Sequence, residues 1–453
     1  MEKVRLRLAM FNQHDSLWIH QAQIVGPQGQ LQPCNVGIRQ GKIAEITIED
    51  RRAHYAEVLD AQGWLLLPGV IDAQVHFREP GLEHKEDLHT ASRACARGGV
   101  TSFLEMPNTC PSTVDQATLD DKLRRAAAKS LVNYGFFIGA TRDNLEELNR
   151  VQPVCGIKVF MGSMHGDLLV EDPAVLERIF ATGRRLIAVH AENHQRILER
   201  RRLLASEFHR PDVHSDVQDE LAALQATELA VRLASKYRRR LHVLHLSTAL
   251  EVEFLRRHKR PWITAEVTPQ HLLLDRSAYF TLGSLAQMNP PLRTPHDNQV
   301  LWQGLQEGVI DFMATDHAPH TLAEKARPYP ESPSGMPGVE TFLPLMLTQA
   351  KKGKCTLAQV VQWLSTQPAR AYGIVNKGQL AVGYDADVVL VDWEHTQPVR
   401  REDLQTKCGW SPFEGWELTG WPQVTIVGGR IVYYQGQFNE AVRGQPLQFQ
   451  AAA

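Results

Sequence analysis

The stretch RLIAVHAE (185–192) is a short apolar run that ends beside a histidine, and it decides the fold because seven other runs share its character. Strands buried on both faces of a parallel sheet read as continuous apolar runs, and helical patterns separate these runs along the chain. Eight parallel strands close a barrel. We therefore predict an α/β fold of the (β/α)₈ or TIM-barrel type. The other runs are LLLPGVIDAQVHF (65–77), VTSFLEM (100–106), NYGFFIGA (133–140), CGIKVFMG (155–162), LHVLHLS (241–247), WITAEVT (262–268) and IDFMATDHAPH (310–320).

The two ends of the chain have a different pattern, with short β-branched runs separated by glycine and aspartate. NVGIRQGKIAEI (35–46) predicts a hairpin that turns at Gly41, and two later segments have the same character. These are GQLAVGYDADVVLVD (378–392) and QVTIVGGRIVYYQG (423–436). We predict that residues 1–67 and 372–453 form one small composite β domain, and that residues 68–371 form the barrel.

Composition excludes several classes of function. The chain has 49 Lys plus Arg against 51 Asp plus Glu, so it lacks the basic excess that binds nucleic acid. No segment approaches the roughly 18 apolar residues of a membrane span, and no signal peptide is recognisable, so we expect a cytoplasmic protein. The six cysteines contain no CxxC pair, which argues against a disulfide framework and a cysteine-based zinc site.

Metal-capable side chains lie at or near the ends of five apolar runs. In a parallel barrel the active site lies at the carboxyl ends of the strands, where residues distant in sequence converge on one axis. A single histidine at such a place is more often a core or surface residue, but five such groups together predict a metal site. They are His76, Lys158, His190, His245 and Asp316.

Lys158 is unusual among these groups because a buried ammonium beside divalent cations suffers desolvation and charge repulsion. A carbamate formed with carbon dioxide would convert it into an anionic oxygen ligand that can bridge two metals. The alternative is a neutral or salt-bridged lysine inside the barrel.

Eight motifs along the chain resemble those of dihydroorotases in the cyclic amidohydrolase superfamily, over about residues 60 to 440. They are IDAQVHFREPG (71–81), EMPNT (105–109), GIKVFMG (156–162), VHAENH (189–194), HLST (245–248), NPPLR (289–293), ATDHAPH (314–320) and SGMPGVE (334–340). The resemblance implies a barrel with one or two zinc ions per chain, a carbamylated lysine and a composite β domain. It also implies reversible hydrolysis of dihydroorotate to carbamoyl aspartate in pyrimidine synthesis.

The resemblance also implies a role for each matching residue. His76 and Asp316 would hold one metal, His190 and His245 the other, and carbamylated Lys158 would bridge them. Asp316 would also be the catalytic proton shuttle. Arg78, Asn108 and His320 would bind the substrate carboxylate, and Asn289, Pro337 and Gly338 would line the ring pocket. Simpler alternatives are an ion pair between Arg78 and Glu79, and a capping role for Asp316.

One departure and two rival functions stay open. The family usually has histidine at the position of Gln74. This chain instead resembles a subgroup that reads QVHFREPG there, and a neutral amide oxygen is a poorer zinc ligand than histidine. One rival is an allantoinase or dihydropyrimidinase, which usually lacks the arginine at Arg78. The other is a non-catalytic scaffold for aspartate transcarbamoylase, which would not need the metal-capable residues. We expect a small-molecule substrate and a homo-oligomer, with aspartate transcarbamoylase as a candidate partner.

Overall fold

A closed barrel of eight parallel strands forms the centre of the protein, seen in a computed structural model that describes residues 15–26, 29–163 and 166–450. The strands follow one another round the barrel in chain order, and an isolated parallel bridge from Val75 of β6 to His317, just after β13, closes the ring. The predicted fold class is therefore confirmed. The strands are β6 (Val70–Val75), β7 (Val100–Glu105), β8 (Asn133–Gly139), β9 (Gly156–Phe160), β10 (Ile187–His190), β11 (Leu241–Val243), β12 (Ile263–Val267) and β13 (Phe312–Met313).

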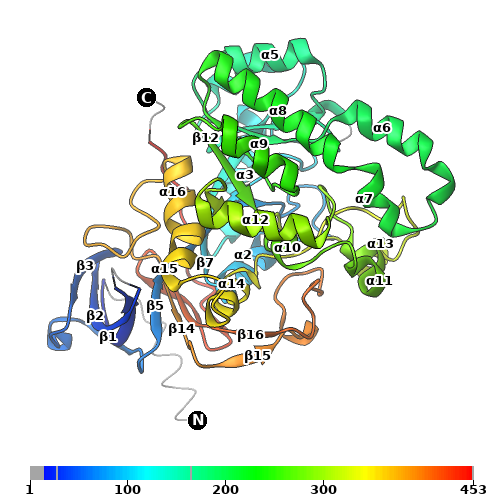
Figure 1. Ribbon diagram of the computed structural model, residues 1–453. Helices are drawn as coiled ribbons and strands as arrows, with labels where there is room; N and C mark the ends of the chain where they lie inside the picture. The colour runs from blue at the N-terminus through cyan, green and yellow to red at the C-terminus, as the bar shows by residue number, and fades with distance from the viewer. Residues whose placement is uncertain (1–14, 27–28, 164–165, 451–453) are drawn as a thin grey trace.

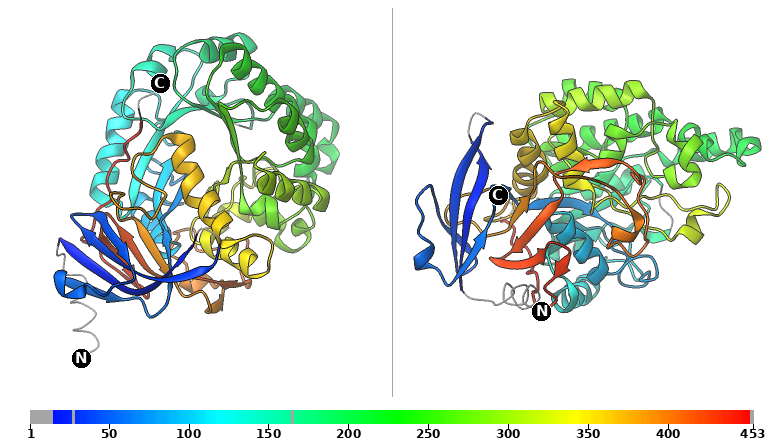
Figure 2. Two further views of the ribbon diagram at one scale, coloured as in Figure 1. Left: turned by 60° about the vertical axis from the view of Figure 1, so that its left-hand side comes forward. Right: turned by 90° about the horizontal axis from the view of Figure 1, so that it is seen from below.

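Helices surround the barrel on its outer side (Figures 1 and 2). Several begin at a side-chain cap: Asp172 accepts from Ala174 N at the start of α5, as the Asp-Pro pair there predicts. The longer helices are α2 (Leu88–Arg97), α3 (Gln116–Lys129), α5 (Pro173–Ala181), α6 (His194–Leu203), α8 (Glu220–Tyr237), α9 (Ala249–His258), α12 (Pro295–Glu307) and α14 (Phe342–Lys351). The shorter ones are α4 (Leu145–Arg150), α7 (His214–Val217), α10 (Pro269–Leu273), α11 (Ala278–Leu282), α13 (Leu322–Lys325), α15 (Leu357–Val361) and α16 (Gln367–Tyr372).

A second sheet of nine strands is built from both ends of the chain and lies beside the barrel (Figure 1). Its N-terminal strands are β1 (Ser16–Val25), β2 (Leu31–Arg39), β3 (Lys42–Thr47), β4 (Glu57–Asp60) and β5 (Leu65–Pro68). Its C-terminal strands are β14 (Val388–Val391), β17 (Pro422–Val427), β18 (Arg430–Tyr434) and β19 (Gln437–Phe438). The two ends meet where β5 pairs with β14, and the hairpin at Gly41 is confirmed.

The first apolar run is two strands rather than one. Its residues LLLP form β5 of the small sheet, whereas VIDAQV forms β6 of the barrel. Gly69 lies between them, where a Cβ atom would come within 2.1 Å of the Thr101 hydroxyl. The chain therefore changes sheets at a point where only glycine fits.

The C-terminal part of the chain also contacts the barrel. Between β15 (Thr396–Pro398) and β16 (Glu417–Thr419), the Trp410 indole N–H donates to the carbonyl of His320 at 2.8 Å. Further on, Leu447 packs in a buried cluster with Phe137 and Phe312 of the barrel strands. The domain boundaries stay a prediction, because residues 372–450 serve both parts of the molecule.

In the part of the chain that the structure describes, no helix is both long enough and apolar enough to cross a membrane.

Candidate functional site

The metal-capable residues at the strand ends, although distant in sequence, surround one cavity of about 180 Å³. Most of the predicted substrate-binding residues line the same cavity. Pro337 and Gly338 are not among its lining residues, because Ser334 and Gly335 form the wall there. The predicted residues that line it are Gln74, His76, Arg78, Asn108, Lys158, His190, His245, Asn289, Asp316 and His320.

On one side of the cavity His76 faces Asp316. His76 Nε2 lies 3.0 Å from Asp316 Oδ1, and the Gln74 amide donates to the same oxygen at 3.1 Å. His76 Nδ1 lies 2.7 Å from the Asn108 amide oxygen. An amide oxygen only accepts, so Nδ1 carries the proton and a neutral ring turns the Nε2 lone pair toward the carboxylate.

Buried acceptors therefore face one another on this side. Burial lowers the pKa of His76, which favours the neutral ring. Burial would raise the pKa of Asp316, but the hydrogen bond and charge that His76 supplies when its ring is protonated outweigh burial and lower it. The side-chain oxygen of Gln74 is buried without a hydrogen-bond partner. Acceptors at this spacing suit a cation between them.

On the other side, His190 and His245 turn nitrogen atoms toward each other, with His190 Nδ1 2.9 Å from His245 Nε2. His190 Nε2 lies 2.7 Å from a carboxylate oxygen of Glu192. Burial lowers the pKa of His190 to about 3, so the ring is neutral at pH 7 and its single N–H donates to Glu192. The Nδ1 lone pair of His190 therefore faces the cavity, as a metal ligand must.

Lys158 lies in the cavity wall with its amine unpaired. Its Nζ is buried, makes no hydrogen bond in the described structure, and lies 4.4 Å from the centre of the Phe160 ring. Burial lowers the pKa of Lys158 to about 7, although Asp316 and Glu266 favour its charged form. A large fraction of this amine is therefore neutral near pH 7, unlike an exposed lysine.

The donor set fits a metal only if Lys158 takes part. Among the described residues, no group of three or more His, Cys, Asp or Glu side chains is arranged to hold a metal ion. Each side of the cavity offers two such side chains. The third ligand on each side, an anionic one, would therefore have to come from a modified Lys158. The lone pairs of His76 and His190 that face the cavity, and the unpaired amine of Lys158, satisfy that requirement. The residues present therefore fit a metal pair with a modified lysine.

The backbone at the site is strained at four non-glycine residues, of which Ser163 has a φ of 55°. Arg78, His245 and Asp316 have φ values of 67°, 36° and 48°, in the left-handed region that side chains with a Cβ rarely adopt. Such strain is retained where the surrounding structure fixes it, and it clusters at functional sites.

Arg78 also lines the cavity. Its Nε donates to the carbonyl of Pro319 at 3.1 Å, and its Nη2 lies 3.2 Å from His320 Nε2. Burial lowers the pKa of Arg78 to about 10, which still leaves it charged at pH 7. The sequence alternative of an ion pair with Glu79 is not present, because Lys129 and Arg125 bind that carboxylate.

Several residues of the site were missed by sequence reasoning. Glu192 follows His190 by two positions, and this His-x-Glu spacing was a signal for the hydrogen bond between them. Phe160, Ser163 and Ala318 also line the cavity, but nothing in the sequence around them distinguishes them.

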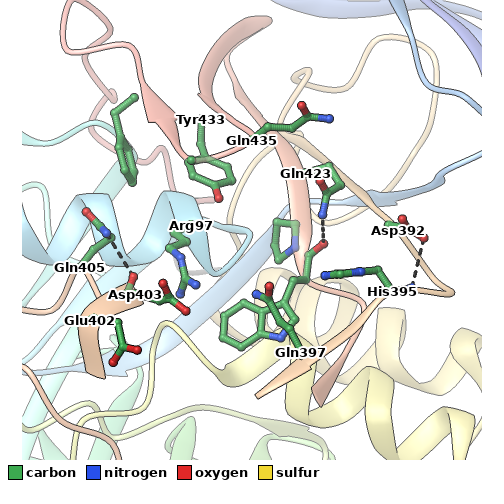
Figure 3. Close-up of a pocket in the computed structure, with 14 residues that line it drawn as sticks. Arg97, Asp392, His395, Gln397, Glu402, Asp403, Gln405, Gln423, Tyr433 and Gln435 are labelled. Carbon is green, nitrogen blue, oxygen red and sulfur yellow. Dashed lines mark hydrogen bonds between the residues drawn. The ribbon is translucent and has the colours of Figure 1, made fainter. Parts of the chain in front are cut away.

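A larger cavity of about 610 Å³ lies elsewhere and shares no lining residue with the site (Figure 3). Arg97 of α2 reaches it beside Tyr433 of β18. The Arg97 guanidinium already donates to Glu340 at 2.7 Å and covers the Trp421 ring at 4.6 Å, so its charge is satisfied within the protein. We therefore place the candidate active site in the smaller cavity at the strand ends.

Comparisons with known proteins agree on one family. The model of the amidohydrolase family matches residues 65–432. A dihydroorotase from Methanosarcina mazei is 38% identical over 90% of this chain and 92% of its own length, and one from Bacillus caldolyticus is 35% identical over 93% and 99%. Among solved structures, the L-hydantoinase (dihydropyrimidinase) from Arthrobacter aurescens has a TM-score of 0.91 at 27% identity, covering 95% of this chain and 99% of that one. The chain belongs to the amidohydrolase family.

Proposed function

We propose that the protein is a dihydroorotase, which hydrolyses the cyclic amide of dihydroorotate to carbamoyl aspartate and catalyses the reverse reaction. The observation that carries the proposal is the charged Arg78, which lines the same cavity as the metal-capable side chains. A guanidinium binds a planar carboxylate through two parallel hydrogen bonds. A substrate ring without a carboxylate would not need an arginine at this position. The curated relatives named dihydroorotase support the same activity.

Zinc is the metal we propose, held on one side by His76 and Asp316, on the other by His190 and His245, and bridged by a carbamate on Lys158. The chemistry that bound zinc supplies is Lewis acidity and access to hydroxide near pH 7. The buried, unpaired amine of Lys158 suits reaction with carbon dioxide, because only the neutral amine is nucleophilic.

Asp316 is the group that we propose moves the proton. Its lowered pKa keeps it ionised near pH 7, so it can accept a proton from the attacking water. It would then deliver that proton to the departing amide nitrogen. Gln74 and His76 both contact Oδ1 and fix the orientation of the carboxylate. Neither contact is a helix cap, so the capping alternative has no support.

Three residues would hold the substrate by its carboxylate: Arg78, Asn108 and His320. Asn289 would bind the polar edge of the ring, with its amide oxygen fixed by His214 Nε2 at 2.9 Å. Anchoring the carboxylate at one wall would place the scissile amide near Asp316 at the other, because both walls belong to one small cavity.

The test is a substrate comparison with the purified, zinc-supplemented protein. We expect hydrolysis of dihydroorotate in preference to hydantoin, dihydrouracil and allantoin, which lack the carboxylate at that position of the ring. A preference for any of those three would move the assignment to a hydantoinase, dihydropyrimidinase or allantoinase. Self-association and binding to aspartate transcarbamoylase stay predictions, which size-exclusion chromatography with and without that enzyme would test.

A further inference from the structure

Lys85 lies just behind the proposed carboxylate site and has none of the roles above. Its Nζ is 3.1 Å from His320 Nδ1 and 3.2 Å from Glu324 Oε1. Its side chain is only 13% exposed. The Lys85 ammonium therefore links the Nδ1 edge of the His320 ring, in the cavity wall, to the Glu324 carboxylate outside the cavity.

The contact with Lys85 fixes the protonation of His320. An ammonium can only donate, so His320 Nδ1 must accept, and the single proton of a neutral imidazole must then lie on Nε2. Burial first, and then the charges of Arg78, Lys85 and Lys325, keep the pKa of His320 well below its usual value. The ring is therefore neutral at pH 7 and carries its proton on the side that faces the cavity.

The result is a pair of adjacent donors. His320 Nε2 lies 3.1 Å from the carbonyl of Ser334 and 3.2 Å from Arg78 Nη2. Guanidinium nitrogens do not accept, so the Nε2 proton of His320 can go only to the Ser334 carbonyl, which requires the same tautomer as the contact with Lys85. The N–H groups of Arg78 and His320 therefore lie side by side, and an acceptor between them can take a hydrogen bond from Arg78 and share the His320 proton with Ser334. A carboxylate is such an acceptor, since its oxygen atoms can take several hydrogen bonds at once.

We propose that Lys85 is a positioning residue that holds His320 as the Nε2–H tautomer and thereby makes it a donor to the substrate carboxylate. This inference rests on the proposed function. Without Lys85 the ring is free to carry its proton on Nδ1, and a lone pair on Nε2 would then repel both the carboxylate and the Ser334 carbonyl.

The rival explanation is a purely structural ion pair between Lys85 and Glu324. Glu324 caps α13 through its other oxygen, which accepts from the backbone N–H and hydroxyl of Thr321. Glu324→Gln keeps an oxygen for that cap but removes the charge that faces Lys85. It is therefore the matched control: a structural role for the ion pair predicts similar effects of Glu324→Gln and Lys85→Met.

The experiment compares steady-state kinetics on dihydroorotate for zinc-loaded wild type, Lys85→Met, Lys85→Arg and Glu324→Gln, with metal content measured for each. We expect Lys85→Met to raise KM by about tenfold while kcat and metal content change little. Lys85→Arg should recover most of the loss, and Glu324→Gln should leave KM within about twofold of wild type. Lys85→Ala serves as a second variant if Lys85→Met does not fold, and it should show the same rise.

A double-mutant cycle with His320→Ala decides whether Lys85 acts through the ring. If it does, Lys85→Met should have no further effect on KM in the His320→Ala background. Additive effects, or an unchanged KM in Lys85→Met alone, would overturn the inference. A wild-type protein that does not hydrolyse dihydroorotate would instead refute the proposed function, so the two failures are distinguishable.

Discussion

Arg78 is the residue on which the proposed substrate class depends. Arg78→Ala should leave metal content unchanged and raise KM for dihydroorotate by at least about tenfold, which corresponds to about 1.4 kcal/mol of lost binding. Arg78→Lys is the control, because it keeps the positive charge but lacks the planar guanidinium with its two parallel donors. It should recover only part of the affinity for dihydroorotate. Kinetics on both variants check this, and a normal KM in Arg78→Ala would show that the carboxylate binds elsewhere.

Lys158 should carry an additional carboxylate group in the metal-loaded protein. The unpaired amine and its lowered pKa favour reaction with carbon dioxide, and bound metal would hold the labile product. High-resolution crystallography of the zinc-loaded protein would show the extra atoms on Nζ. Lys158→Ala should lose metal and activity, and short carboxylic acids should restore part of both. A plain ammonium in a fully loaded crystal would exclude the bridging role.

Gln74 should make one metal position weaker than the other. On its side the proposed ligands are His76, Asp316 and the carbamate, and the amide nitrogen of Gln74 already donates to Asp316. Gln74→His should tighten zinc binding at the weaker position, because imidazole is a better zinc ligand than a neutral amide. Calorimetric titration of the metal-free protein measures this directly, with Gln74→Ala as the control. Two equally tight sites in the unmodified protein would show that Gln74 is no handicap.

At the scale of elements, one buried ion pair ties α3 to the end of β7. The Lys122 ammonium lies 2.8 Å from Glu105 Oε2, both side chains are fully buried, and the other Glu105 oxygen accepts from the backbone of Phe77. Lys122→Met leaves a buried carboxylate without its counter-charge, so it should lower the free energy of unfolding by about 3 to 5 kcal/mol. Urea denaturation measures the loss.

The double variant Lys122→Met/Glu105→Gln is the control for this ion pair. It should recover part of the lost stability, since no uncompensated charge is left in the core. A single variant that is as stable as wild type would mean that the pair does not hold α3 against the barrel.

The strand elements were predictable because barrel strands are buried on both faces and read as continuous apolar runs. The carboxyl-end rule then predicted a common site for His76, Lys158, His190, His245 and Asp316, and all of them line one cavity. The close approach of Thr101 to Gly69, where the first run passes from one sheet to the other, was not predictable, because it depends on tertiary packing.

The loop that closes the cavity was also beyond sequence reasoning. Gly335 reaches the wall because its N–H donates to the carbonyl of Gln287 and its own carbonyl accepts from the buried Lys325 ammonium. Gly338 is instead held by His317, whose Nδ1 accepts from its N–H at 3.0 Å. Such tertiary hydrogen bonds leave no local pattern in the chain, so the sequence pointed three residues too far along the loop.

At the scale of the whole molecule, Asp387 connects the small sheet to the barrel. It accepts from Asn133 of β8 at 3.0 Å and from the Gly428 N–H of the small sheet at 2.7 Å, and it pairs with Lys377. Lys377 also lies 2.9 Å from Asp385. Burial opposes the charge on Lys377, but the two carboxylates outweigh it and raise its pKa.

Lys377→Met should therefore destabilise the protein at pH 7, and by less in acid. Burial would raise the pKa of Asp385, but Lys42 and Lys377 outweigh burial and lower that pKa below its ordinary value of 3.8. The stabilisation that ionised Asp385 contributes is thus present above pH 3.8. It is lost as the pH falls through the lower pKa that Asp385 has in the folded protein. Urea unfolding of both proteins at pH 7 and pH 3 measures the difference. An equal difference in the free energy of unfolding at both pH values would show that Lys377 does not stabilise the protein through the ionised Asp385 carboxylate.

The central claim is that a metal pair at the strand ends hydrolyses a carboxylate-bearing cyclic amide. The most direct test is to titrate zinc into chelated protein, with carbon dioxide present, while recording dihydroorotate hydrolysis. We predict no turnover without metal, and recovery of turnover as two positions of unequal affinity fill. Full activity in the metal-free protein, or no activity on dihydroorotate in the fully loaded protein, would contradict the account.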